Sequence, residues 1–385
     1  MKKVLFLQIK GKSYGGVWHV NKLVGEELIK NNYDVHIVSI RDNQTDIVLE
    51  HDPRLIVKTI NEQDLWETIS LSEILKEAKK LHFLNATKMF LDKVKHKQGL
   101  NKDIKKLHKY IYDYNPDYII ASHYQLLDMI PKSYLNKVIH EQHTSFKDAK
   151  SHKATVKTFK KYNNKVKYLW LTKQTMIEAE KYGLKNNSYI YNAVRFKTEK
   201  IAPVTKNKKL ITIARLSEQK RIDIMIDIIE DIFKAEKYKA WSLEIYGTGP
   251  LEEKLKKLTT NNKQIKFMGL TNNPQKELLT SSINLNTSPY EGFSLSILEA
   301  NECGVPTIAF DFGESTEEEI INNKTGIIAK DNEDYKKQLQ ELMDNSEKLT
   351  KISKNAKQFS KNFQIESIIK EWLNLFSEVD KRKGE

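Results

Sequence analysis

One stretch of the chain strongly limits the folds open to it, because it reads as a strand, a loop, a helix and a second strand. The apolar run Ile283–Leu285 leads into Thr287–Ala300, and Cys303-Gly304 separates that segment from a second apolar run at Val305–Phe310. A helical connection of this length returns the chain to the same sheet in parallel orientation. The stretch therefore predicts an α/β fold built on a parallel sheet.

The loop within this stretch has the composition of a ligand-binding site. Glu291 and Gly292 stand just before the helix, which begins with Phe293, Ser294 and Leu295. Backbone N–H groups in the first turn of a helix have no partner within it, so they bind phosphate or another anion well. A second carboxylate, Glu299, follows eight residues after the first. Because a helix rarely needs this arrangement to fold, we expect Glu291 and Gly292 to serve a ligand and not packing.

The totals are those of a soluble protein with two domains. At 385 residues the chain is too long for one ordinary domain, and its 39% hydrophobic and 30% charged residues are usual for globular proteins. The single cysteine, Cys303, excludes an internal disulfide and is expected to be buried. No run approaches the roughly 18 apolar residues of a membrane-spanning helix, and Val4–Ile9 is too short for a secretion signal. These features predict a cytoplasmic protein.

The positive charge is confined to the first half of the chain. Residues 1–195 hold 34 Lys and Arg against 21 Asp and Glu, a net charge of +13, whereas residues 196–385 hold 30 of each. Much of the excess lies in 93–109 and 147–167. Such a surface suits an anionic partner, namely a phosphate-containing polymer, a membrane surface or nucleic acid. A solvated, lysine-rich helix surface is the alternative.

The first half repeats the strand–loop–helix–strand pattern. Val4–Ile9 is a predicted strand, Val17–Lys30 a helix and Asp34–Ile40 a second strand. The first loop contains Gly15-Gly16, so Gly16 is a candidate for close approach of the backbone to a phosphate or sugar, with a plain tight turn as the alternative. Residues 64–115 are predicted to be a helical insertion without chemistry.

Two histidines come shortly after predicted strands of the first half. His123 follows Tyr118–Ala121, and His143 follows the apolar pair Val138-Ile139. Open α/β sheets bind ligands at the carboxyl ends of their strands, so both are candidate site residues. Neither has the Cys, His or Asp neighbours of a zinc site, and we predict no metal.

The second half places charged residues and glycines at strand ends. Leu210–Ala214 is a predicted strand that ends at Arg215, and Lys220 follows five residues later, before a helix. Two cations at this spacing suit a diphosphate, with a surface ion pair as the alternative for each alone. The strand Trp241–Tyr246 ends in a turn that begins at Gly247, which is either structural or close to the same ligand.

The two acids complete this constellation. Glu299 suits the vicinal hydroxyls of a ribose and Glu291 suits the hydroxyls of a sugar, because a carboxylate accepts several hydrogen bonds. With the two cations, they describe a site for a nucleoside-diphosphate sugar. A dinucleotide dehydrogenase is disfavoured, because no Gly-x-Gly-x-x-Gly sequence with a downstream acid follows the first strand.

Three motifs give the chain a family resemblance. They are the run Arg215-Leu216-Ser217-Glu218-Gln219-Lys220, the turn Gly247-Thr248-Gly249-Pro250 and the E-x7-E pair Glu291 and Glu299. Together they resemble the retaining GT-B glycosyltransferases of family four.

The resemblance implies a role for each matching residue. It implies that Glu291 contacts the donor sugar and that Glu299 binds the ribose. Arg215 and Lys220 would neutralise the leaving diphosphate. His123 would contact the donor sugar, and Gly16 would lie near the diphosphate.

A narrower resemblance is to the branch that adds glucose or N-acetylglucosamine to wall teichoic acids and serine-rich adhesins. It rests on Leu171–Gln174, Ser217–Arg221 and Ile245–Gly249. The chain departs from that branch at Asp311–Thr316, where a Tyr-Gly-Pro-Ser-like segment is usual. The branch implies a hydroxyl acceptor in the cell envelope, such as teichoic acid, a lipid-linked glycan or a surface glycoprotein.

The sequence thus predicts a GT-B fold, with two Rossmann-like domains facing across a cleft. Residues 1–195 are the expected acceptor domain, 196–365 the nucleotide-sugar domain and 366–385 a closing helix that returns to the first domain, with an exposed linker over 195–208. The expected reaction moves a hexosyl unit from a UDP-sugar, either UDP-glucose or UDP-N-acetylglucosamine, without a metal or other cofactor. No nucleic-acid partner is expected, contact with the inner membrane face is an option, and the oligomeric state is open. The alternatives are a non-catalytic GT-B partner subunit that binds a glycan, and a nucleotide-sugar epimerase.

Overall fold

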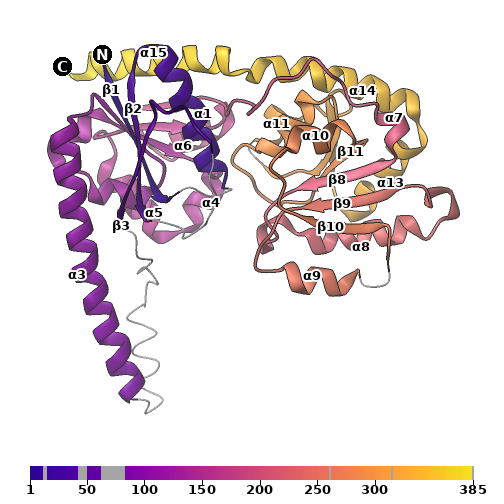
Figure 1. Cartoon of the computed structure of the whole chain (residues 1–385), viewed down its shortest axis with the longest axis horizontal. Helices are drawn as coiled ribbons and strands as arrows, with labels where there is room; N and C mark the ends of the chain where they lie inside the picture. Colours follow the sequence, from indigo (N-terminus) through magenta and orange to yellow (C-terminus); the bar gives the residue numbers. More distant parts are fainter. Residues whose placement is uncertain (12–14, 42–49, 62–82, 260–261, 314, 384–385) are drawn as a thin grey trace. The chain divides into compact units, whose positions relative to one another are not determined.

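The computed structural model describes residues 1–11, 15–41, 50–61, 83–259, 262–313 and 315–383. This part of the chain divides into two compact units. Unit 1 comprises Met1–Glu141, Ala154–Tyr168 and Phe376–Glu385, and unit 2 comprises Gln142–Lys153 and Leu169–Leu375. Figure 1 traces the chain through both.

The first sheet has seven strands in the order β3-β2-β1-β4-β5-β6-β7. Pairing is parallel from β3 through β2, β1 and β4 to β5. The central run Val4–Leu7 is fully buried, as expected for a parallel strand that is covered on both faces. The strands are β1 (Lys3–Lys10), β2 (Asp34–Arg41), β3 (Ile56–Asn61), β4 (Tyr118–Ala121), β5 (Val138–Gln142), β6 (Lys167–Trp170) and β7 (Asn187–Tyr189).

The helices between these strands follow the expected pattern. Helix α1 buries Trp18, Val24 and Leu28, which recur at helical spacing. The predicted helical insertion over 64–115 is confirmed at 83–114, and its first part, up to residue 82, lies outside the described residues. The helices are α1 (Gly16–Lys30), α3 (Phe83–Tyr114), α4 (Phe146–Ser151), α5 (Lys153–Tyr162) and α6 (Lys173–Lys181).

The second sheet has six strands in the order β10-β9-β8-β11-β12-β13, and every neighbouring pair is parallel. In Figure 1, α10 and α11 lie on one side of this sheet, and α8 and α9 lie on the other. The strands are β8 (Lys209–Ile213), β9 (Ser242–Tyr246), β10 (Ile265–Gly269), β11 (Ile283–Asn286), β12 (Thr307–Phe310) and β13 (Gly326–Ala329). The helices are α7 (Val204–Asn207), α8 (Ile222–Phe233), α9 (Glu252–Leu258), α10 (Pro274–Leu279), α11 (Leu295–Glu302), α12 (Thr316–Glu319), α13 (Asn332–Asp344) and α14 (Ser346–Phe359).

The chain closes with helix α15 (Ile365–Lys383), whose last turns belong to unit 1. The Phe376 ring stacks on that of Tyr118, with centroids 4.1 Å apart and an interplanar angle of 9°. The Asp380 carboxylate accepts hydrogen bonds from the Tyr118 hydroxyl at 2.6 Å and from Lys2 Nζ at 2.5 Å. The hydrogen bonds that Lys2 makes with Asp380 and Tyr118 raise the pKa of its amine. The predicted closing helix is therefore confirmed, and so is the α/β class with two Rossmann-like sheets.

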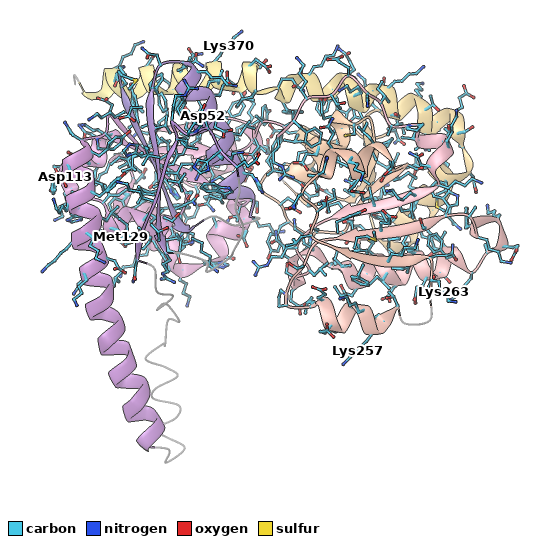
Figure 2. The ribbon with its side chains drawn as sticks, viewed as in Figure 1. Asp52, Asp113, Met129, Lys257, Lys263 and Lys370 are labelled. Atoms are coloured by element: carbon cyan, nitrogen blue, oxygen red, sulfur yellow. The ribbon has the colours of Figure 1, made fainter. Side chains whose placement is uncertain are left out.

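The segment 195–208 differs from the exposed linker that we expected. Thr198, Ala202 and Val204 are buried, and the Ala202 N–H donates to the Cys303 carbonyl at 2.9 Å. The alternation of buried and exposed residues shows a segment that packs along unit 2. Charged side chains elsewhere, such as Lys257 and Lys370 in Figure 2, point outward.

Candidate functional site

The carboxyl ends of three adjacent strands build the candidate site in unit 2. Strands β9, β8 and β11 are neighbours in a parallel sheet, so the loops after Tyr246, Ile213 and Asn286 emerge along the same edge. These loops carry the cations, the glycine turn and the first acid that the sequence singles out. The geometry brings part of this set together.

Lys220 and Glu291 form a direct ion pair. Lys220 Nζ lies 2.5 Å from Glu291 Oε1, and the side chains are 21% and 8% exposed. The backbone around the pair is fixed from both sides. The Thr287 hydroxyl donates to the carbonyl of Lys220 at 2.8 Å, and the Gln219 carboxamide donates to the carbonyl of Tyr290 at 3.1 Å. The pair therefore sits on two loops that are tied to each other.

The second acid, Glu299, has a partner that the sequence did not indicate. The Arg195 guanidinium donates through Nε to Oε1 and through a terminal nitrogen to Oε2 at 2.8 Å, a bidentate contact. Glu299 is 1% exposed and Arg195 is 23% exposed. Burial lowers the pKa of Arg195, but the Glu299 carboxylate outweighs that effect and the net shift is upward. We placed Arg195 in a linker, because nothing in its neighbourhood marks a partner 104 residues away.

The start of helix α11 is also engaged by a residue that the sequence did not indicate. The Ser294 N–H, which we expected to bind phosphate, donates to Glu319 Oε2 at 2.8 Å. Glu319 is completely buried, and its Oε1 has no hydrogen-bond partner among the described residues. Burial raises the pKa of Glu319 well above its usual range, which favours the neutral acid.

Aromatic packing holds the residue before Ser294 in place. The Phe293 ring stacks against Tyr191 with centroids 5.1 Å apart, and its carbonyl accepts from the Asn192 carboxamide at 3.1 Å. The N–H groups of Leu295 and Ser296, the first two helical residues, have no hydrogen-bond acceptor among the described residues and remain available to an anion.

The glycines at this edge have packing reasons. A Cβ at Gly247, where φ is +134°, would lie 1.9 Å from the carbonyl oxygen of Ala214. A Cβ at Gly292 would lie 2.1 Å from the carbonyl oxygen of His143. Our expectation that Gly292 has no packing purpose is therefore wrong. Only a glycine permits these two close backbone contacts.

Arg215 is the one predicted cation at this edge that stays unpaired. Its side chain is exposed and has no hydrogen-bond or ion-pair partner in the part of the chain that the structure describes. Its carbonyl accepts from the Ser217 N–H at 2.9 Å, which shapes the turn that leads to Lys220. An exposed guanidinium at the same sheet edge as the Lys220–Glu291 pair is free to meet an anionic ligand.

The two site residues that we predicted in the first half lie in unit 1. Gly16 is the first residue of α1, directly after the capping position of Gly15. His123 follows β4, and its Nδ1 accepts a hydrogen bond from the Gln125 N–H at 3.3 Å. His123 therefore caps a short helical turn. The proposed contacts of both residues with a donor stay predictions.

The described residues lack two features, a cluster that could hold a metal ion and a helix that could span a membrane. No group of three or more His, Cys, Asp or Glu side chains there is arranged to hold a metal ion. Across the same residues, no helix is both long and apolar enough to cross a membrane.

Part of the chain resembles a known protein family. Residues 193–359 match the family described as glycosyl transferases group 1. The matched region covers less than half of the chain. This region holds the second sheet and both ion pairs, Arg195–Glu299 and Lys220–Glu291.

Two relatives extend the likeness. The poly(ribitol-phosphate) alpha-N-acetylglucosaminyltransferase of Staphylococcus aureus (strain COL) is 30% identical over 203 residues, which are 51% of this chain and 39% of that protein. An uncharacterized glycosyltransferase of Haemophilus influenzae is 26% identical over 97% of this chain and 100% of its own length.

A solved structure shows the shared fold. A mutant of S. aureus TarM, crystallised with fondaparinux, alpha-GlcNAc-glycerol and UDP, has a TM-score of 0.76 and 18% identity over 98% of this chain and 100% of that one. This likeness shows that the fold is of the GT-B type.

Proposed function

We propose that the protein is a retaining glycosyltransferase that moves a hexosyl unit from UDP-glucose or UDP-N-acetylglucosamine to a hydroxyl of a cell-envelope acceptor. The observation that carries the proposal is the Lys220–Glu291 contact at a parallel sheet edge within the group 1 region. The names of the relatives, with a poly(ribitol-phosphate) acceptor, an N-acetylglucosaminyl product and UDP, support the donor and acceptor classes.

The Lys220–Glu291 pair serves both sides of the bond that breaks, with Lys220 toward the diphosphate and Glu291 toward the donor sugar. Lys220 has three N–H donors and donates one to Glu291, which leaves two for oxygens of the diphosphate. Glu291 keeps Oε2 for a hydroxyl of the donor sugar. The ion pair holds both groups in place before the substrate arrives, so little reorganisation is needed in the transition state.

The remaining charge on the leaving group falls to Arg215 and the start of α11. As the bond between the anomeric carbon and the UDP oxygen breaks, negative charge grows on the diphosphate, and a guanidinium stabilises it over two oxygens. The acceptor hydroxyl forms its bond on the face that UDP leaves, and its proton passes to the departing phosphate oxygen. With two cations in this role, the reaction needs no metal.

Glu299 and Arg195 act as one unit in this proposal. Each carboxylate oxygen of Glu299 accepts one hydrogen bond from Arg195 and retains a second lone pair for a ribose hydroxyl. The guanidinium fixes the plane of the carboxylate and so sets the direction in which those lone pairs point.

The acceptor is proposed to be anionic because of the lysines in unit 1. Lys102, Lys105 and Lys109 of α3 are exposed and recur at intervals of three and four residues, which places them on one face of the helix. A phosphate-rich polymer would bind there in a salt-sensitive way, and an anionic membrane surface would use the same charges.

Direct binding and turnover measurements test the proposal. In isothermal titration, UDP should bind the wild-type protein and should bind Lys220→Ala more weakly, whereas Glu291→Ala should lose turnover of UDP-sugar far more than UDP affinity. A product with the α-configuration of the donor, seen by NMR, would support retention. Undiminished turnover in Glu291→Ala or unchanged UDP affinity in Lys220→Ala would refute the assigned roles.

A further inference from the structure

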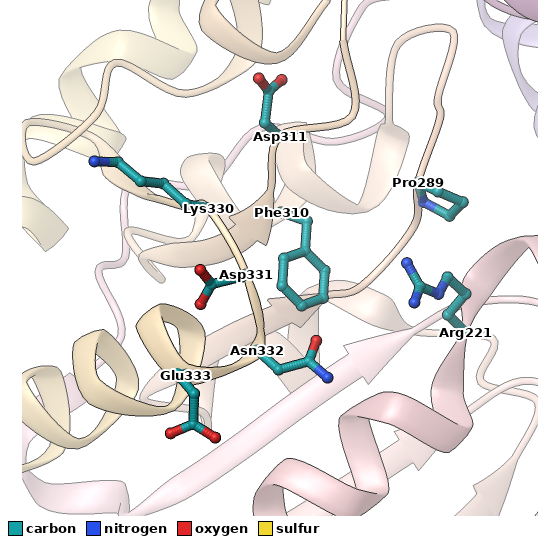
Figure 3. A pocket seen from close by; sticks show the side chains of 8 residues that line it. All are labelled: Arg221, Pro289, Phe310, Asp311, Lys330, Asp331, Asn332 and Glu333. Carbon is teal, nitrogen blue, oxygen red and sulfur yellow. The ribbon is translucent and has the colours of Figure 1, made fainter.

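A pocket of about 460 Å³ lies beside the Lys220–Glu291 pair but has a different lining. It opens at the carboxyl edge of the second sheet, where β12 and β13 end and where α8 and α13 begin (Figure 3). Its lining residues are Arg221, Pro289, Phe310, Asp311, Lys330, Asp331, Asn332 and Glu333. None of them has a part in the donor chemistry described above.

Arg221 stands in this pocket with an unusual backbone. Its φ of 46° and ψ of 43° lie in the left-handed region, which residues other than glycine and asparagine rarely adopt. Among the described residues, seven non-glycine positions have positive φ, and five of them are asparagines. The other two are Lys208 and Arg221. Because the backbone conformation of this turn does not favour arginine, we infer that the arginine is kept for its side chain.

The Arg221 side chain points into the pocket without an internal partner. Figure 3 shows its guanidinium and the Asn332 carboxamide near the Phe310 ring. Neither the guanidinium nor the carboxamide has a hydrogen-bond or ion-pair partner in the part of the chain that the structure describes. Hydrogen-bonding groups of two kinds thus converge beside an aromatic ring.

Two of the three acids around the rim accept hydrogen bonds from the protein. Asp311 Oδ1 accepts from the Gly313 N–H and from the Thr316 hydroxyl, both at 2.9 Å. Asp331 Oδ1 caps α13 by accepting from the Asp334 N–H at 2.9 Å. These carboxylates keep further lone pairs for hydroxyl donors, and their negative charge disfavours an anionic ligand in the pocket.

We propose that this pocket is a saccharide-binding subsite that takes one neutral, hydroxyl-rich sugar ring. Sugar hydroxyls both donate and accept, so they match the guanidinium, the carboxamide and the rim carboxylates at once. The C–H face of a sugar fits the apolar surface that Phe310 and Pro289 provide. A phosphate would meet three acids against two cations, and an apolar ligand would leave the polar groups unpaired.

The pocket shares its supporting loops with the Lys220–Glu291 pair. The Thr287 hydroxyl donates to the carbonyls of Lys220 at 2.8 Å and of Arg221 at 3.0 Å, and Pro289 precedes Glu291 by two residues. A sugar held here would neighbour the donor sugar and would be a unit of the glycan that accepts or has received it. That use rests on the proposed function, whereas the binding of a sugar to the pocket does not.

The test uses Arg221→Gly, because glycine suits a φ of 46° and the variant should fold at least as stably as the wild type. Lys208→Gly is the matched control, since Lys208 has φ 45° and ψ 41° and does not line the pocket. Asn332→Ala is a second pocket variant. Binding of glucose and of N-acetylglucosamine to the full chain is measured by saturation-transfer NMR without UDP, with inorganic phosphate as a competitor.

We expect the sugar affinity to fall about tenfold in Arg221→Gly and in Asn332→Ala, because each variant loses one strong hydrogen bond. The sugar affinity should be unchanged in Lys208→Gly. Equal sugar affinity in Arg221→Gly and wild type, absence of sugar binding, or displacement of the sugar by phosphate would each overturn the subsite. UDP titration of the same proteins separates the two proposals. Sugar binding without UDP binding would refute the donor site alone, and UDP binding without sugar binding would refute this subsite alone.

Discussion

The buried pair of Arg195 and Glu299 offers the sharpest test of the site's physical description. In Arg195→Ala, the Glu299 carboxylate, 1% exposed in the wild type, loses both hydrogen bonds of its bidentate partner. Removing one member of a buried ion pair typically costs about 3–5 kcal/mol, because the other charge is left uncompensated. Arg195 is 23% exposed, so water partly replaces it, and we expect a loss near the lower end, about 3 kcal/mol.

The assay is urea unfolding followed by tryptophan fluorescence, with midpoint and slope reported for each transition because the chain has two units. Replacing both partners, as in Arg195→Met with Glu299→Gln, removes the unpaired charge and should cost less than the single change. Lys181→Ala is the control, since its pair with Glu178 is 64% and 34% exposed, and it should cost under about 1 kcal/mol. A loss below about 1 kcal/mol in Arg195→Ala, or a double variant worse than the single one, would refute the reasoning.

Three further changes probe the glycine before α11, the buried acid at its start and the closing helix α15. Gly292→Ala should destabilise unit 2 by about 1–3 kcal/mol, because its Cβ would meet the carbonyl oxygen of His143 at 2.1 Å; thermal unfolding equal to wild type would contradict this. Glu319 has a raised pKa in the folded state, so the folded protein binds the extra proton, and stability should fall as pH rises from about 4.5 toward the folded pKa. Glu319→Gln should flatten that decline, which urea titrations at about pH 5 and about pH 8 would detect, and an unaltered slope would count against the buried acid. Phe376→Ala should cost about 3–5 kcal/mol, because the ring is 1% exposed and stacks on Tyr118, and a loss under about 1 kcal/mol would mean that the closing helix does not depend on it.

The parts of the fold that the sequence predicted are those with a strong local signal. Continuous apolar runs such as Val4–Leu7 mark strands that are covered on both faces, and the periodic apolar residues of α15 mark a helix with one buried stripe. Strand β3 was missed because it is a half-buried edge strand of mixed composition. The linker prediction over 195–208 failed because proline and lysine describe local preference, whereas Ala202 packs through a contact with Cys303.

The residues of the candidate site likewise divide into those with a local sequence signal and those without one. Lys220, Glu291 and Glu299 were singled out because charged residues at strand ends and helix starts stand out in the sequence, and their roles stay predictions. Arg195 and Glu319 were not, because each acts through a partner far along the chain, 104 residues away for Glu299 and 25 for Ser294. The purpose of Gly292 was misread for a related reason, since the carbonyl that it packs against belongs to His143.

We propose that the Lys220–Glu291 site transfers a hexosyl unit from a UDP-sugar. The most direct measurement is UDP release by purified protein from UDP-glucose, UDP-N-acetylglucosamine and UDP-galactose, with and without a poly(ribitol phosphate) or poly(glycerol phosphate) acceptor, beside the variant Glu291→Gln. We expect acceptor-stimulated release from UDP-glucose or UDP-N-acetylglucosamine, and we expect the variant to lose it. Release from none of the three donors, or equal release by Glu291→Gln, would contradict it.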